Sequence, residues 1–175
     1  MSRQILLHLS LIDGIGSSVI QYLIARKPDD MPWAQLYDCS VFDLMSLGIS
    51  QVVAQKIVNG LQQRAILDRE LADIEKYNFS MISFLDTTYP EQLKHIHMPP
   101  SVLYVRGTLP ADEVKKVAFV GARKADQYGK AAIDMIVPDL VAHQIAIISG
   151  GARGADSMAH SSAITCGGIT VAVLG

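Results

Sequence analysis

The stretch IISGGARGADSMAHSSAITCGGITVAVLG, residues 147–175, decides the fold of the second half of the chain. An apolar run ends in Ser-Gly-Gly, continues through Arg-Gly-Ala-Asp into an alanine-rich segment, and leads to a second apolar run. This order predicts a strand, a tight turn, a helix and the next strand. Exposed amide groups at the start of such a helix attract anions, so the turn is a candidate anion site.

The same alternation begins earlier in the chain and predicts an α/β fold. Strands are expected at 117–120, 145–148 and 169–174, with helices at about 129–143 and 155–165. The strands are continuous apolar runs, which is typical of a parallel sheet buried on both faces. Pro138 lies inside the first helix and is expected to kink it. No helix follows the last strand to cover its free face, so we expect this domain to be incomplete at its C-terminus.

Residues 1–77 have the pattern of a separate helical domain. Apolar residues recur at helical spacing, and two helix pairs are interrupted at Gly14-Ile15-Gly16 and at Gly48-Ile49-Ser50. The first interruption resembles a helix–hairpin–helix, a motif whose backbone amides hold a DNA phosphate without reading base sequence. The helix after it begins without lysine or arginine, so we favour a structural or protein-contact role.

The pattern changes at Phe79, and we assign residues 78–175 to the α/β domain. Strands are expected at 81–86 and 102–107, with a short helix at 91–96 between them. Tyr89-Pro90 is expected to form a structural corner.

The composition excludes several functional classes. Half of the 175 residues are hydrophobic and 18% are charged, as in a folded globular chain. The formal net charge of -2 excludes a broadly basic surface, so any contact with nucleic acid must be a local patch. Cys39 and Cys166 lie far apart, and His95 and His97 lack a third ligand, so we predict neither a disulfide framework nor a metal site. No segment reaches the roughly 18–20 apolar residues of a membrane span, and we expect a soluble, cytoplasmic protein.

Two strand-to-helix turns are expected at one edge of the sheet, where open α/β folds bind ligands. They are VGARKADQYG, residues 120–129, and SGGARGAD, residues 149–156. Arg123 and Arg153 add guanidinium groups suited to phosphate. Neither turn contains GxGxxG, and the sequence lacks GxxxxGKS/T, which disfavours ordinary dinucleotide and P-loop ATP binding. We expect the phosphate of another ligand, with Tyr128 either stacking on a base or packing over the turn.

Asp156 and His160 stand four residues apart on the second helix. Such a pair could act as a general acid and base. More often it steadies a helix start and the turn before it, and we favour that interpretation. We therefore predict no catalytic residue.

Taken together, the motifs resemble the DNA-processing protein A family, also called DprA or Smf. Residues 149–160 resemble its signature S-G-x-A-x-G-x-D-x-x-A-H. TTYPEQLKHIHMPPSVLYVRG, residues 87–107, resembles its Tyr-Pro segment before a diproline and a strand, and VGARKADQYG resembles its Gly-Ser-Arg turn. The three motifs occur in order between about residues 79 and 175. The N-terminal helices resemble the SAM-like domain of the family.

The resemblance implies an extended Rossmann-type domain that binds single-stranded DNA and loads a RecA-type recombinase onto it in natural transformation. It implies no enzymatic activity and no cofactor, and a homodimer for the full-length protein. The residues that it places at the DNA pocket are Gly121, Arg123, Ser149, Gly150, Arg153 and Gly154. Ala122 stands where the family usually has serine, which removes one hydroxyl contact. Family members continue past the last strand, with a further pocket lysine and the pairing surface.

The alternative is a nucleotide-cleaving enzyme of the lysine-decarboxylase-like (LOG) type. Its Rossmann core also has a Gly-Gly turn after the second strand. The Tyr-Pro segment and the Ala-His end of the signature favour DNA binding over this alternative.

Overall fold

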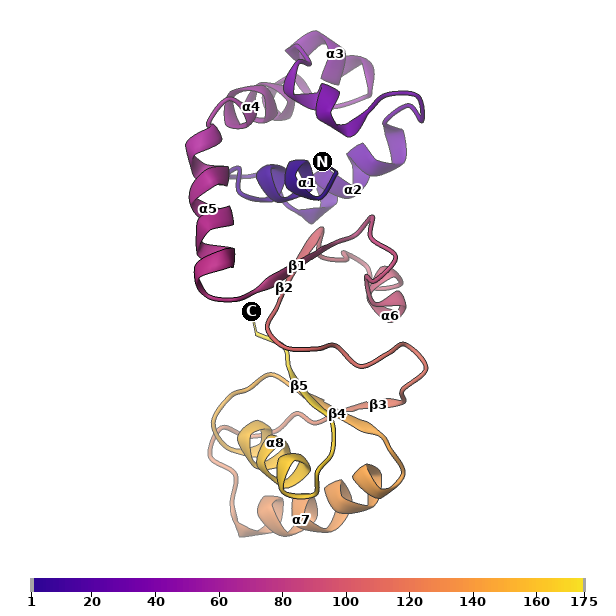
Figure 1. The fold of residues 1–175 in the computed structure, drawn as a ribbon, viewed down its shortest axis with the longest axis vertical. Helices are drawn as coiled ribbons and strands as arrows, with labels where there is room; N and C mark the ends of the chain where they lie inside the picture. The colour runs from indigo at the N-terminus through magenta and orange to yellow at the C-terminus, as the bar shows by residue number, and fades with distance from the viewer. Residues whose placement is uncertain (1, 175) are drawn as a thin grey trace. The chain divides into compact units, whose positions relative to one another are not determined.

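The chain forms two compact units, residues 1–108 and residues 109–175, in a computed structural model that describes residues 2–174 (Figure 1). Packing groups residues 78–108 with the N-terminal helices, because the first helix contacts both strands of this segment. The domain boundary between residues 77 and 78, drawn from the change in sequence pattern, stays a prediction. No helix within the described residues is long and apolar enough to cross a membrane.

The first unit is helical up to residue 76, as predicted. Its helices are α1 (Ser2–Ser10), α2 (Ser17–Arg26), η1 (Trp33–Tyr37), α3 (Val41–Ser46), α4 (Gln51–Leu61) and α5 (Arg64–Lys76). Helix α3 begins at a capping box: the Asp43 amide donates to the Ser40 hydroxyl, and the Ser40 amide donates to the Asp43 carboxylate. Both bonds satisfy amides that have no partner inside the helix.

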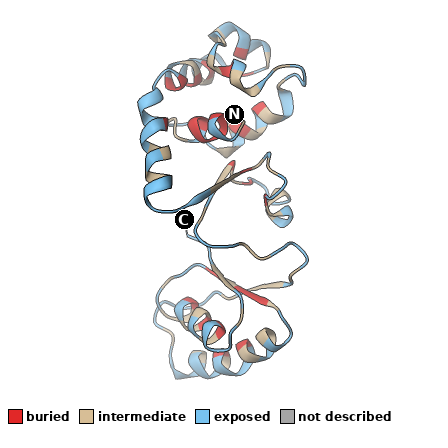
Figure 2. Cartoon of the chain, viewed as in Figure 1, coloured by how far each residue is buried: buried red, intermediate tan, exposed pale blue. Residues whose placement is uncertain are grey.

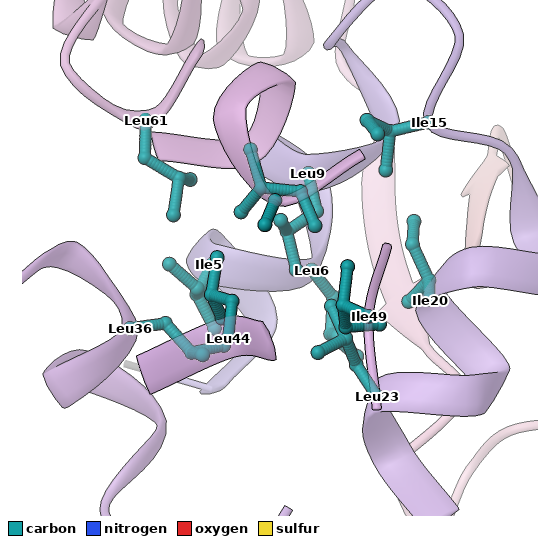
Figure 3. Close-up of a cluster of buried hydrophobic side chains, with 12 residues drawn as sticks. Ile5, Leu6, Leu9, Ile15, Ile20, Leu23, Leu36, Leu44, Ile49 and Leu61 are labelled. Carbon is teal, nitrogen blue, oxygen red and sulfur yellow. The ribbon is translucent and has the colours of Figure 1, made fainter. Parts of the chain in front are cut away.

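Helix α1 is the centre of the first core (Figures 2 and 3). Its side chains Ile5, Leu6 and Leu9 are fully buried against residues of α2, η1, α3 and α4. Full burial of one such side chain contributes about 1.5–3 kcal/mol. His8 is buried in the same helix, and its Nδ1 lies 3.3 Å from the Tyr37 hydroxyl.

A small antiparallel sheet follows the helices. Strand β1 (Ser80–Ser83) pairs with β2 (Val102–Val105), and α6 (Glu91–Lys94) lies between them in the sequence. Strand β1 ends earlier than predicted because the Asp86 carboxylate accepts the Ser83 amide at 2.7 Å and folds the chain into a turn. Tyr89 is buried, and its hydroxyl donates to the Pro100 carbonyl at 2.8 Å, which confirms the predicted structural corner.

The second unit has the predicted α/β alternation. It consists of β3 (Lys116–Ala118), α7 (Gln127–Ala142), β4 (Ala146–Ser149), α8 (Ala155–Thr165) and β5 (Thr170–Ala172). The three strands are parallel, in the order β3-β4-β5, with Val117 opposite Ile147 and Ile148 opposite Val171. This parallel sheet confirms the predicted fold class.

Helices α7 and α8 pack through small and branched side chains. The buried cluster consists of Ile133, Val137, Ile147, Ala159 and Ala163. The two alanines of α8 keep this helix close to the sheet, as the sequence predicts. Pro138 lies within α7, which continues through it to Ala142.

Candidate functional site

The two glycine- and arginine-containing turns are in direct contact. The Ala155 amide at the start of α8 donates to the Ala122 carbonyl of the first turn at 3.2 Å. Gly154 has a φ of +86°, and a Cβ at this position would overlap the Ala122 carbonyl and lie 2.5 Å from the Arg123 carbonyl oxygen. Only glycine combines that backbone conformation with so close an approach. The predicted meeting of the turns at one sheet edge is confirmed.

Ser149 fastens the second turn to the neighbouring strand. Its hydroxyl is buried and donates to the Phe119 carbonyl at 2.7 Å. Phe119 directly follows β3, so this bond joins the carboxyl ends of β3 and β4. The predicted contact of Ser149 with a ligand stays a prediction.

Asp156 holds the backbone of the second turn from within. Its Oδ2 accepts the Gly150 amide at 3.1 Å and the Ala152 amide at 3.3 Å. A Cβ on Gly150 would lie 3.0 Å from the same oxygen, so the close approach of the turn depends on glycine. The preferred interpretation of Asp156, a residue that steadies the helix start and its turn, is confirmed.

His160 bonds to a different group, so it forms no acid–base pair with Asp156. Its Nδ1 lies 2.6 Å from the Thr170 hydroxyl, which in turn donates to the Ile147 carbonyl at 2.9 Å. Because the threonine proton is used on the carbonyl, Nδ1 of His160 must carry the proton of the other bond. The histidine therefore ties α8 to β5 and β4.

Cationic side chains concentrate at the two turns. Arg123, Lys124 and Arg153 are exposed, and none of them has an acidic partner within 4.0 Å among the described residues. Lys124 was not among the site residues predicted from the sequence, although its position directly after Arg123 could have indicated it. Three exposed cations without acidic partners thus lie on two contacting turns of a chain whose net charge is negative.

The carboxylates at these turns are used internally. The Asp126 side chain accepts the Gly129 amide at 2.8 Å and so caps α7, while Asp156 binds two amides before α8. The Gly129, Gly150 and Ala152 amides are therefore occupied. The predicted contact of the other helix-start amides with an anion stays a prediction.

A hollow of about 370 Å³ lies over the first turn and the start of α7. Its lining includes Gly121, Ala122, Lys124, Asp126, Gly129 and Ala155. This volume is in the range of small-ligand clefts. Tyr128, in the first turn of α7, is 82% exposed, so its ring is accessible for stacking. Among residues 2–174, no three His, Cys, Asp or Glu side chains are placed to hold a metal ion.

A further cation, Lys56, lies at the hairpin between α1 and α2. Gly14 has a φ of +78°, and a Cβ there would lie 2.5 Å from Nζ of Lys56 on α4. No side chain caps the start of α2. Lys56 could not be assigned to the hairpin from the sequence, because α4 brings it there from far along the chain.

Comparisons with known proteins agree on one family. A sequence profile described as DNA recombination-mediator protein A matches residues 80–175. The chain is 36% identical over 101 residues to the DNA processing protein DprA of Streptococcus pneumoniae, a match that covers 58% of this chain and 36% of that protein. It is 31% identical over 132 residues to the protein Smf of Escherichia coli, with 75% and 35% covered.

A solved structure supports the same relationship. The X-ray structure of DprA from Streptococcus pneumoniae superposes with a TM-score of 0.65 at 25% identity, over 91% of this chain and 58% of that one. The DprA of Bacillus subtilis is 29% identical over 133 residues, with 75% of this chain and 45% of that protein covered. The chain thus spans about a third to a half of the length of these curated relatives.

Proposed function

This chain belongs to the DNA recombination-mediator protein A family, and we propose that it binds single-stranded DNA and assists a RecA-type recombinase on that DNA during natural transformation. The observation that carries the proposal is the contact between the two turns, which gathers three unpaired cations at the carboxyl edge of a parallel sheet. Relatives named DNA processing proteins and the recombination-mediator profile support this choice of ligand.

The proposed contacts are made to phosphates. Arg123 and Arg153 each present a planar guanidinium group that matches two phosphate oxygens. Lys124 adds a point charge at the hollow over the first turn. Contacts of this kind hold the nucleic acid backbone without reading base sequence. The proposed site consists of Gly121, Arg123, Arg153 and Gly154. Ser149 and Gly150 hold the turn in place, because the Ser149 hydroxyl and the Gly150 amide are both bonded within the protein.

We propose a binding role rather than catalysis. Asp156 and His160, the acid–base pair that the sequence offered, are bonded to separate groups, which favours binding over the nucleotide-cleaving alternative. The proposal also includes a cytoplasmic location, expected from the composition, and a homodimer, which the resemblance implies for the full-length protein.

Fluorescence anisotropy with labelled oligothymidine over a salt series tests the proposal. For single strands, each neutralised phosphate contributes a slope of about -0.7 in log K against log salt. Arg123→Ala and Arg153→Ala should each weaken binding and flatten the slope by about 0.7. Arg69→Ala is the matched control, because Arg69 is an exposed arginine on α5.

The outcome that contradicts the proposal is equally concrete. If both turn variants remain folded and bind with the affinity and slope of the Arg69→Ala control, the turns do not hold the DNA. If duplex binds as tightly as the single strand, the proposed strand preference is wrong.

A further inference from the structure

Among the described residues, Asp156 is the buried carboxylate, with 7% of the residue exposed. A buried carboxylate is costly unless hydrogen-bond donors surround it. Here the donors are the Gly150 and Ala152 amides, which belong to the turn directly before its own helix. Its position in the first turn of α8 is also the position that the helix dipole favours for a negative charge.

The carboxylate takes the place that an external anion would take on these amides. Amides that point inward to Asp156 cannot also bind a phosphate. The turn is therefore folded around the Asp156 carboxylate. The residue that follows Ala152 is Arg153, which is exposed and has no acidic partner among the described residues. The direction in which Arg153 leaves the turn depends on the backbone that Asp156 holds.

Gly154 fixes the other end of the same segment. Its backbone packs on the carbonyl groups of Ala122 and Arg123, and the Ala155 amide donates to the Ala122 carbonyl. The segment 150–154 is thus attached at its start to Asp156 and at its end to the first turn. Arg153 lies between the two attachments.

We propose that Asp156 is a positioning residue for phosphate binding: its carboxylate acts as an internal anion that holds residues 150–152 so that Arg153 faces the DNA phosphate. This inference rests on the proposed function. Without the carboxylate, the turn populates other conformations, and apparent affinity falls in proportion to the fraction that remains competent. If that fraction falls to about one tenth, the apparent Kd rises about tenfold.

The test compares the wild-type chain with Asp156→Ala and Asp156→Asn in oligothymidine anisotropy. We expect Asp156→Ala to bind about tenfold more weakly with an unchanged salt slope, because all three cations remain. Replacing chloride by acetate at constant ionic strength should restore affinity in Asp156→Ala beyond any change in the wild type, because acetate can occupy the vacated amides. Asp156→Asn keeps one acceptor oxygen and should bind with intermediate affinity.

The control is Asp43→Ala, which removes a carboxylate cap from α3 in the other unit and should leave DNA affinity unchanged. Should Asp156→Ala fail to fold, the isosteric Asp156→Asn decides. Equal affinity of the folded Asp156 variants and the wild type overturns the positioning role. A loss that acetate does not restore, equal in both variants, overturns it as well, because it shows only a damaged unit. Absence of wild-type binding contradicts the proposed function itself.

Discussion

Gly154→Ala is the substitution whose effect follows most directly from the contact between the turns. Alanine at a φ of +86° stores about 1–3 kcal/mol of backbone strain. Its Cβ would also meet the carbonyl oxygens of Ala122 and Arg123, which are backbone atoms that cannot rotate away. Overpacking of this kind costs about 1–3 kcal/mol more. The expected loss is therefore about 2–6 kcal/mol, a large part of the roughly 3–10 kcal/mol expected for a unit of this size.

Gly167→Ala supplies the matched control within the same unit. Gly167 has a φ of +71°, but no atom lies within 4 Å of a Cβ there, so this variant has the strain without the overlap. Urea unfolding followed by circular dichroism reports both units, whereas fluorescence of Trp33, the single tryptophan, reports the first. Gly154→Ala should lower the stability of the second unit by at least about 1 kcal/mol more than Gly167→Ala. Equal losses in the two variants would refute the packing of Gly154 on the first turn.

Three further predictions concern stability. Burial, and then the positive charge of Arg64, lower the pKa of His8 below its usual value of 6.5. The buried neutral imidazole therefore contributes fully to the free energy of unfolding above pH 6.5, and this contribution is lost as the pH falls below that value. Trp33 fluorescence should show this loss in urea titrations near pH 5–6, and His8→Leu should remove it. Leu6→Ala should destabilise the first unit by about 2–5 kcal/mol in the same assay; a loss under 1 kcal/mol would contradict the central position of α1. Ser149→Ala should cost the second unit about 1–3 kcal/mol in circular dichroism, because the Phe119 carbonyl loses its buried donor; no change would show that the bond is dispensable.

The sequence predicted the order of elements better than their ends. Apolar runs indicated the strands at 117–120 and 169–174, but the paired strands are Lys116–Ala118 and Thr170–Ala172. Val120 is apolar and yet 85% exposed, beyond the end of β3. The end of the strand was mispredicted because hydrophobicity does not show where the neighbouring strand stops offering hydrogen bonds. The β1–β2 pair packs with the N-terminal helices. The sequence did not indicate this packing, because a change in sequence pattern does not show which core a pair of strands joins.

Topology explains why the meeting of the turns was predictable. Parallel strands place their following turns at one edge, so Arg123 and Arg153 could be assigned together from the sequence. The inward direction of Asp156 was less accessible, because it depends on whether the amides before a helix face the protein or the solvent. Lys56 at Gly14 could not be found from local sequence, since tertiary packing of α4 alone places it there.

The most direct measurement of the central claim is the salt dependence of oligothymidine binding by the double variant Arg123→Ala/Arg153→Ala, compared with Lys56→Ala at the helical hairpin. If the contacting turns hold two phosphates, the double variant should flatten the slope of log K against log salt by about 1.4, and Lys56→Ala should leave it unchanged. A Lys56→Ala variant that loses slope, beside a folded double variant that keeps the wild-type slope, would contradict the account and move the contact to the hairpin.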